Sequence, residues 1–435
     1  MGRYVVSTAQ QQKEMLHDIG LESLDDLYKV VPKEARLADL DLPAGLSEME
    51  VSDAVNALAA KNTQYQAIFR GAGAYNHYIP AIVKSVTSKE QFVTTYTPYQ
   101  AEISQGVLQS IFEYQTQICE LTGMDVSNAS VYDGAVAIAE AVFMTQERKK
   151  SRVLISENIN PQYLEVVKTY CESRNVPIEM LKNDKGLTSK ADLQEKLTED
   201  VAAVVIQSPN YYGILENVEE LVELTHQNKS RFILSANPTA FGLLKSAGEM
   251  GVDICVGEGQ PLGMPLSFGG PYLGYMACTK EMMRKLPGRI VGQTVDHDGR
   301  TCYVLTLQAR EQHIRREKAS SNICSNEALC AMTASVYLAA VGPDGLKQVA
   351  ENSTAHAHYL QKQLADLGYR LVYDQPFFHE FMTYCPTAAH KLEKQLADKG
   401  ILSGLPMGDK MLWCTTELNS KRQIDELIEA LKEVC

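Results

Sequence analysis

The hydrophobic pattern of the chain changes near residue 130, where short apolar runs begin to alternate with longer stretches whose apolar residues recur at helical spacing. Short runs rich in β-branched side chains predict strands, and the stretches between them predict helices. The predicted strands are residues 153–156, 178–181, 201–206 and 231–235, followed by two more within residues 252–278. This alternation predicts an α/β fold with a mainly parallel, doubly wound sheet.

Residues 1–65 have a different pattern, which predicts a helical arm. Ser23 and Ser47 each begin a sequence typical of a capping box, and apolar residues follow both of them at helical spacing. Pro32 stops or redirects the first of these helices. We expect this arm to lie on the main domain or on a partner.

The end of the chain predicts a smaller α+β domain. Its strands are expected at residues 370–373, 380–384 and 411–415, and its helices at residues 388–398 and 421–433. We therefore divide the chain into a helical arm at 1–65, a large α/β domain at 66–325 and a small α+β domain at 326–435.

Composition narrows the class of protein. A chain of 435 residues can form two or three domains, and its net charge of −13 argues against nucleic acid or an anionic membrane as the main partner. The ten cysteines show no paired metal-binding spacing, which indicates reduced thiols in a cytoplasmic compartment. The sequence has neither a signal-peptide core nor a long apolar run, so we expect a soluble protein.

The series of alternating strand and helix units ends with the stretch at residues 252–278. It predicts a buried strand, a connection rich in glycine and proline, and a second strand. In enzymes of the aminotransferase-like fold (fold type I) that use pyridoxal phosphate (PLP), this connection carries the lysine that forms the Schiff base. Here no lysine occurs between Lys245 and Lys280.

Two other positions also argue against a bound PLP. The turn at Asp133, Gly134 and Ala135 lies where a helix start could hold a phosphate, but a carboxylate there repels an anion and more often caps the helix. The strand at 231–235 ends in Leu-Ser and is followed by alanine, with no acid to pair with a pyridinium nitrogen. Together with the missing lysine, these features predict that the chain binds no cofactor itself.

The histidines were considered as acids, bases or metal ligands. His77, His297 and His313 are candidates, but the sequence around His297 is typical of a hairpin tip. The mixed charges of residues 310–318 indicate a solvated or interface helix rather than a nucleic-acid surface. We predict neither a metal site nor a nucleic-acid partner.

Several runs of the sequence resemble the P-protein of the glycine cleavage system. They are residues 96–106 (Tyr-Thr-Pro-Tyr-Gln-Ala-Glu-Ile-Ser-Gln-Gly), 113–117, 128–134, 265–271 (Pro-Leu-Ser-Phe-Gly-Gly-Pro), 286–289 and 306–323. The likeness covers nearly the whole chain, and the last run is long enough to be highly specific. In that family the catalytic unit is one long chain with two homologous halves, or two subunits. This sequence resembles subunit 1, the half without the PLP lysine.

The resemblance implies a reaction and its partners. PLP on subunit 2 condenses with glycine, carbon dioxide leaves, and the aminomethyl group passes to the lipoyl arm of the H-protein. The present chain is then a subunit of glycine dehydrogenase (decarboxylating) with no catalytic lysine of its own. The resemblance further implies that an aromatic loop lines the partner's site, and its residues are Tyr96, Thr97, Pro98, Tyr99 and Gln100.

Alternatives remain open from the residues alone. Tyr96 and Tyr99 could instead pack under the helix that follows them. The chain could be an independent PLP aminotransferase or lyase that uses Lys280, although Lys280 follows the second strand rather than the connection. It could also be an assembly subunit that has lost all catalytic function.

Overall fold

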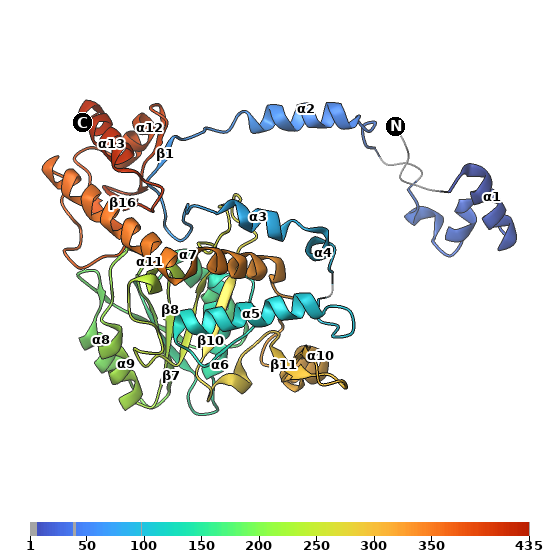
Figure 1. Cartoon of the computed structure of the whole chain (residues 1–435), viewed down its shortest axis with the longest axis horizontal. Coiled ribbons are helices and arrows are strands. Elements are labelled where there is room, and N and C mark those ends of the chain that lie inside the picture. Colours follow the sequence, from blue (N-terminus) through green and yellow to red (C-terminus); the bar gives the residue numbers. More distant parts are fainter. Residues whose placement is uncertain (1–6, 38–40, 97, 435) are drawn as a thin grey trace. The chain divides into compact units, whose positions relative to one another are not determined.

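A computed structural model describes residues 7–37, 41–96 and 98–434 of the chain (Figure 1). The chain divides into two compact units, with the boundary between Thr63 and Gln64. Each unit is described here by itself.

The first unit consists of short helices. They are α1 (Ala9–Asp18), the 3₁₀ helices Leu24–Tyr28 and Lys33–Ala35, and α2 (Glu48–Ala59). Ser47 and Glu50 form the expected capping box at the start of α2. Ser23 and Asp26 form another, but the turn that follows stays a 3₁₀ helix. Its apolar side chains are exposed among the described residues of this unit, so no packing within the unit stabilises a longer α-helix there.

A seven-stranded sheet forms the centre of the second unit. Its order is β2-β10-β9-β8-β7-β3-β4. Neighbours from β9 to β4 run parallel, whereas β10 is antiparallel to both β9 and β2, which confirms a mainly parallel sheet. The strands are β2 (Val126–Ser127), β3 (Arg152–Ser156), β4 (Ile178–Leu181), β7 (Val201–Gln207), β8 (Arg231–Ser235), β9 (Ile254–Glu258) and β10 (Gly274–Cys278).

Side chains that alternate along these strands build a core on each face of the sheet. On β8, for example, Phe232 and Leu234 belong to one core and Ile233 to the other. The first face is covered by α5 (Gln105–Thr122), α8 (Lys190–Lys196), α9 (Val218–Gln227) and the first half of α11 (Ala328–Asp366). The second is covered by α6 (Gly134–Thr145) and α7 (Pro161–Ser173). Helices on both faces give the doubly wound arrangement expected from the sequence.

Two long helices support the first face. Helix α5 ends at Gly123, whose left-handed backbone (φ 68°) is the termination that the sequence predicts. Helix α11 is interrupted at Gly342, with Pro343 next to it. By length and composition alone, α11 is apolar enough to span a membrane, but it contacts α3 (Ala81–Thr87) and α5, and Tyr337 is fully buried. The short helix α4 (Glu90–Val93) follows α3.

The C-terminal part forms a separate core around a three-stranded antiparallel sheet in the order β13-β16-β15. Its elements are β13 (Glu380–Tyr384), α12 (Ala389–Ala397), β15 (Leu405–Met407), β16 (Lys410–Cys414) and α13 (Lys421–Val434). Figure 1 shows α12, α13 and β16 gathered at one end of this unit. The predicted strand at 370–373 is wrong, because only Leu371 forms a bridge there. Strand β14 (Ile401–Leu402) instead pairs with β1 (Ala67–Ile68).

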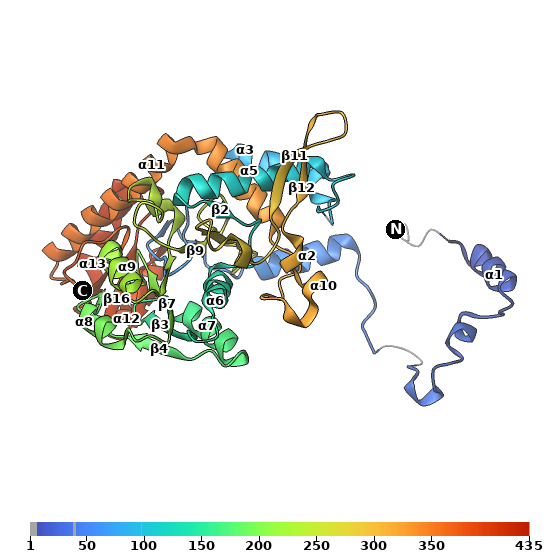
Figure 2. The same ribbon diagram turned by 90° about the horizontal axis from the view of Figure 1, so that it is seen from below.

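A hairpin of β11 (Val291–Val295) and β12 (Thr301–Leu305) extends from the body of the unit (Figure 2). His297 lies at its turn, as the sequence predicts. The continuous helix expected at 310–318 is wrong. The chain there forms the short pieces Gln308–Arg310, α10 (Gln312–Arg315) and Arg316–Lys318, because Arg316 has a positive φ of 54° that breaks the helix. A smaller hairpin pairs β5 (Asn183–Asp184) with β6 (Leu187–Thr188), and 3₁₀ turns occur at Pro238–Gly242 and Met283–Lys285.

Candidate functional site

The connection between β9 and β10 is held inside the protein by Gln260. The Gln260 side chain is fully buried. Its oxygen accepts from the Tyr75 backbone N–H at 2.8 Å, and its amide nitrogen donates to the Tyr75 carbonyl at 2.9 Å and to the Met264 carbonyl at 2.8 Å. The two bonds to Tyr75 join the connection to the loop at residues 71–80. The oxygen of the Gln260 amide has one partner and its NH₂ group has two.

The start of α6 is occupied by two carboxyl groups. Asp133 caps the helix, because its side chain accepts from the Val136 N–H at 2.8 Å, as the sequence favoured. Glu258, at the end of β9, accepts from the Gly134 N–H at 3.0 Å. Burial raises the pKa of the Glu258 carboxyl to about 7, even though backbone N–H groups, first that of Leu273, act to lower it.

The end of β8 carries no acidic residue. Ser235 and Ala236 are followed by Asn237, and the Ala236 carbonyl accepts a hydrogen bond of 2.8 Å from the Tyr275 hydroxyl. The Asn237 amide lies 3.4 Å from Nε2 of His379. In these contacts the end of β8 therefore meets only Tyr275 and His379, neither of which is an acid.

A buried cluster of acids and histidines continues from the connection into the C-terminal part. The Tyr75 hydroxyl donates to Glu380 at 2.7 Å, and the Tyr75 and His379 rings lie 4.7 Å apart. His77 pairs with Glu417 at 2.7 Å. Burial raises the pKa of Glu380 to about 7, whereas burial and then His77 lower the pKa of His379 well below its ordinary value. At neutral pH this cluster holds His379 uncharged.

The structure places the predicted loop residues in contrasting surroundings. Tyr96 is 94% exposed, Pro98 is buried and Gln100 is exposed, while Thr97 lies outside the described residues. Tyr99 is half-buried beside the core around Leu108 and Ile111 of α5. Only part of the loop therefore packs under the helix.

The hydroxyl of Tyr99 is used within the chain. It donates to the Asn326 side-chain oxygen, and the guanidinium of Arg289 lies 5.1 Å from the Tyr99 ring centre. Asn326 in turn donates to Ser130 at 2.9 Å, and Arg289 pairs with Glu311. Segments that carry the family resemblance, far apart in the sequence, thus meet around Tyr99. In the described part of the chain, these contacts do not extend to the connection between β9 and β10.

The three candidate histidines are not brought together. His77 is buried against Glu417, His297 is fully exposed beside Asp298, and His313 lies half-exposed near Glu311. Among the described residues, no group of three or more His, Cys, Asp or Glu side chains is placed to hold a metal ion.

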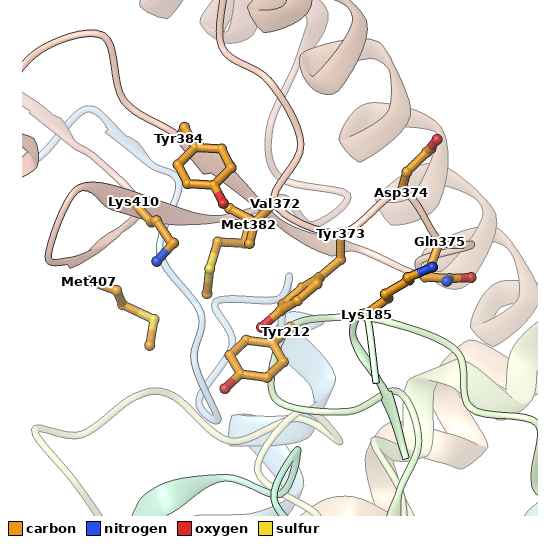
Figure 3. Close-up of a pocket in the computed structure, with 10 residues that line it drawn as sticks. All are labelled: Lys185, Tyr212, Val372, Tyr373, Asp374, Gln375, Met382, Tyr384, Met407 and Lys410. Carbon is orange, nitrogen blue, oxygen red and sulfur yellow. The ribbon is translucent and has the colours of Figure 1, made fainter. Parts of the chain in front are cut away.

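An open cavity of about 560 Å³ lies in the C-terminal part (Figure 3). Tyr212 and Tyr373 lie side by side in it with ring centres 5.1 Å apart, and the Lys410 ammonium lies 5.6 Å from the Tyr384 ring centre. The remaining lining residues are Lys185, Val372, Asp374, Gln375, Met382 and Met407. Neither the aromatic loop nor the connection contributes to it, so it is separate from the positions that the sequence singles out.

Comparison with known proteins decides the family. The model of the glycine cleavage system P-protein family matches residues 2–431 of the chain. The chain belongs to this P-protein family. A relative from Desulforamulus reducens, named probable glycine dehydrogenase (decarboxylating) subunit 1, is 48% identical over 99% of both chains. A crystal structure of a glycine decarboxylase P-protein in inhibitor-bound form superposes with a TM-score of 0.95 at 40% identity and covers 100% of both chains.

More distant similarities to solved structures show only the fold of this member of the family. A cysteine desulfurase from Thermococcus onnurineus aligns with a TM-score of 0.64 at 13% identity, over 90% of this chain and 99% of that chain. The architecture is that of PLP-dependent enzymes of fold type I, as the sequence predicts.

Sequence reasoning missed Glu258 and the Tyr75–Glu380 pair as features of the site. Glu258 did leave a signal, because it is a charged residue that ends an otherwise apolar run directly before the connection. Tyr75 and Glu380 lie more than 300 positions apart in the sequence, and no local pattern relates them.

Proposed function

We propose that this chain is the subunit of glycine dehydrogenase (decarboxylating) that lacks the Schiff-base lysine. In this proposal it works with a lysine-bearing subunit 2 that holds PLP. The complex decarboxylates glycine, releases carbon dioxide and transfers the aminomethyl group to the lipoyl group of the H-protein, in the cytoplasm. The full-length likeness to chains named subunit 1 and to a glycine decarboxylase supports this function.

The observation that carries the proposal is the absence of lysine from residues 246–279, which include the whole connection between β9 and β10. Lys280 does not replace it. Gly274 pairs with Glu258 at one end of β10, and Cys278 pairs with Ile254 at the other, so Lys280 follows the end away from the connection. Five strand residues separate the two ends by roughly 13 Å, at about 3.3 Å per residue.

The residues of this chain do not fit a bound PLP. A phosphate at the start of α6 would meet Glu258 and Asp133, and a pyridinium nitrogen near the end of β8 would meet no carboxylate. The proposal therefore assigns the cofactor to the partner subunit.

Exposed apolar side chains in the first unit support a partner. Half of the exposed large hydrophobic residues of the described chain fall before residue 64. On α2 they are Met49, Val51, Val55 and Leu58, and none of the residues of that helix is buried. Apolar faces of this kind mark protein–protein contacts in soluble proteins. We assign the arm to an interface, with the main domain or with the partner subunit.

We further propose that residues 96–100 line the entrance of the partner's site. The 94% exposure of Tyr96 supports this, since an aromatic side chain with no packing partner within its own chain is available to another chain. Tyr99 has an internal hydrogen bond and would position the loop rather than contact substrate.

Reconstitution tests the function. The chain and its presumed partner are purified separately, and glycine-dependent exchange of labelled carbon dioxide is measured for each alone and for the mixture. We expect no exchange by this chain alone and full exchange by the mixture, because an interface of this type is usually obligate. Borohydride should reduce no lysine-linked cofactor on the isolated chain. Full exchange by the partner alone, or a reducible adduct on this chain, would contradict the proposal.

A further inference from the structure

Glu258 has three backbone hydrogen bonds inside the protein. Its Oε2 accepts from the Gly134 N–H at 3.0 Å. Its Oε1 accepts from the N–H groups of Gln260 at 3.0 Å and Leu273 at 2.9 Å. Only 8% of the residue is exposed. The three donors come from the start of α6 and from both ends of the β9–β10 connection.

These donors are of the kind that hold a phosphate in other proteins. Backbone N–H groups at a helix start and in a neighbouring loop, all directed at one point, form an anion site. Here the carboxyl group of Glu258 already uses them, and Asp133 accepts from a further N–H group of the first turn, that of Val136. A phosphate would have to displace both side chains to obtain the same bonds.

Two glycines show how closely the start of α6 approaches the sheet. A Cβ atom added to Gly134 would come within 2.9 Å of the Glu258 nitrogen, and one added to Gly274 would come within 2.4 Å of the Asp133 carbonyl oxygen. The start of α6 is therefore in direct contact with β9 and β10. The buried Glu258 carboxyl, bonded to the Gly134 N–H, occupies this helix start.

We propose that the Glu258 side chain keeps the fold type I pocket of this chain closed to phosphate-bearing cofactors. It does so by occupying the anion position at the start of α6. The chain thus excludes a ligand such as pyridoxal phosphate by a filled site as well as by the missing lysine. This inference does not depend on the glycine reaction, and its test uses neither glycine nor the partner subunit.

The test removes the side chain and supplies inorganic phosphate as the probe. Full-length wild type and Glu258→Ala are compared by isothermal calorimetry and thermal melts, in phosphate and in chloride of equal ionic strength. We expect no phosphate-specific effect on wild type. Glu258→Ala should bind one phosphate per chain saturably, and phosphate should raise its melting temperature by several degrees, because a ligand that binds only the folded state stabilises it.

Glu216→Ala is the matched control. Glu216 is also 8% exposed, and it accepts from the Thr188 N–H at 2.8 Å and from the side chains of Asn158 and Asn210. Its loss removes a buried, bonded carboxyl away from the start of α6, so this variant should be destabilised without gaining phosphate binding.

Phosphate binding by the two variants decides whether the proposal holds. A folded Glu258→Ala chain that binds no more phosphate than Glu216→Ala overturns the proposal, and so does weak, non-saturable binding that shows an adventitious ion only. If Glu258→Ala does not fold in chloride, it is refolded in phosphate. Recovery of folded chain in phosphate alone supports the proposal, and failure in both buffers overturns it.

Discussion

Two helix starts in the main unit are built in opposite ways. At the start of α6, Glu258 and Asp133 accept from the N–H groups of Gly134 and Val136, and Gly134 is in contact with β9. At the start of α5, Ser104 makes no capping bond in the described part of the chain, and Gly106 has nothing within 4 Å of an added Cβ. We call these the closed start and the open start. The closed start uses two of its free N–H groups for bonds to side chains, whereas no described side chain caps the open start, which follows the aromatic loop.

The largest expected effect compares the same substitution at both starts. Gly134→Ala places a methyl group 2.9 Å from the Glu258 nitrogen, so it should lower the free energy of unfolding by about 1–3 kcal/mol. Gly106→Ala meets no atom, and alanine favours helix, so it should raise stability by up to about 1 kcal/mol. Urea unfolding of both variants measures the difference. Equal effects would show that the two starts do not differ.

A second prediction concerns pH and the cluster next to the closed start. Glu380 has a folded pKa of about 7, above its ordinary 4.5, so between these values the folded chain binds more protons than the unfolded chain. Its contribution to stability is therefore fully present below pH 4.5 and is lost as pH rises to 7, with a slope of up to about 1.4 kcal/mol per pH unit.

Glu380→Gln removes this titration and should make the pH dependence of unfolding between pH 5 and 7 less steep, while Glu258, whose pKa is also raised to about 7, retains part of the slope. Glu417→Gln is its control. The hydrogen bond and charge of His77 lower the pKa of Glu417 despite its burial, so its contribution to stability is present above pH 4.5 and is lost as pH falls below that value. Glu417→Gln should therefore change the slope below pH 4.5 and leave the slope at pH 5–7 in place. An unchanged slope in Glu380→Gln would mean that this carboxyl does not titrate there.

A third prediction concerns Tyr99, beside the open start. Tyr99→Phe removes the hydrogen bond to Asn326, which should lower stability by about 0.5–1.5 kcal/mol in a thermal or urea melt of the chain. If the hydroxyl also meets substrate in the complex, carbon dioxide exchange should fall roughly ten- to a hundredfold, as expected for a bond of about 1.5–3 kcal/mol to a charged group. Lower stability with normal exchange would place Tyr99 in the packing of the chain alone.

The smallest effect on stability is expected for Tyr96→Ala. The side chain is 94% exposed, so the melt should change by less than about 0.5 kcal/mol. Exchange by the reconstituted complex should nevertheless fall, because the proposal places Tyr96 at the partner's site. Gln100→Ala, another exposed change in the same loop, tests whether the effect is specific to the aromatic ring. Unchanged exchange in both variants would remove the loop from the site.

Most strands of the sheet could be predicted from the sequence because each strand depends on a local pattern. Runs such as residues 201–206 are buried on both faces, and such runs are apolar throughout. The prediction of a strand at 370–373 was wrong for a related reason. Only Leu371 pairs there, and whether an apolar run becomes a strand depends on a neighbouring edge that the local sequence does not describe.

The candidate site could be predicted only in part. The missing lysine, the cap at Asp133 and the lack of an acid after β8 could each be read locally. The role of Glu258 could not, since it arises only when β9 brings the carboxyl group to a helix that begins 124 positions earlier. The hydrogen bond from Tyr99 to Asn326 could not be predicted either, because the two residues are 227 positions apart.

The filled helix start also bears on the history of such a chain. A lysine placed in the connection by one substitution would find Glu258 at the start of α6 and no acid after β8. Replacing Glu258 first would leave three buried N–H groups without an acceptor, a loss of about 1–3 kcal/mol for each group. A chain with the lysine alone would therefore still have a filled helix start, and a chain without Glu258 would be less stable. No single substitution supplies both the lysine and a free helix start, so a cofactor site in this chain requires more than one change.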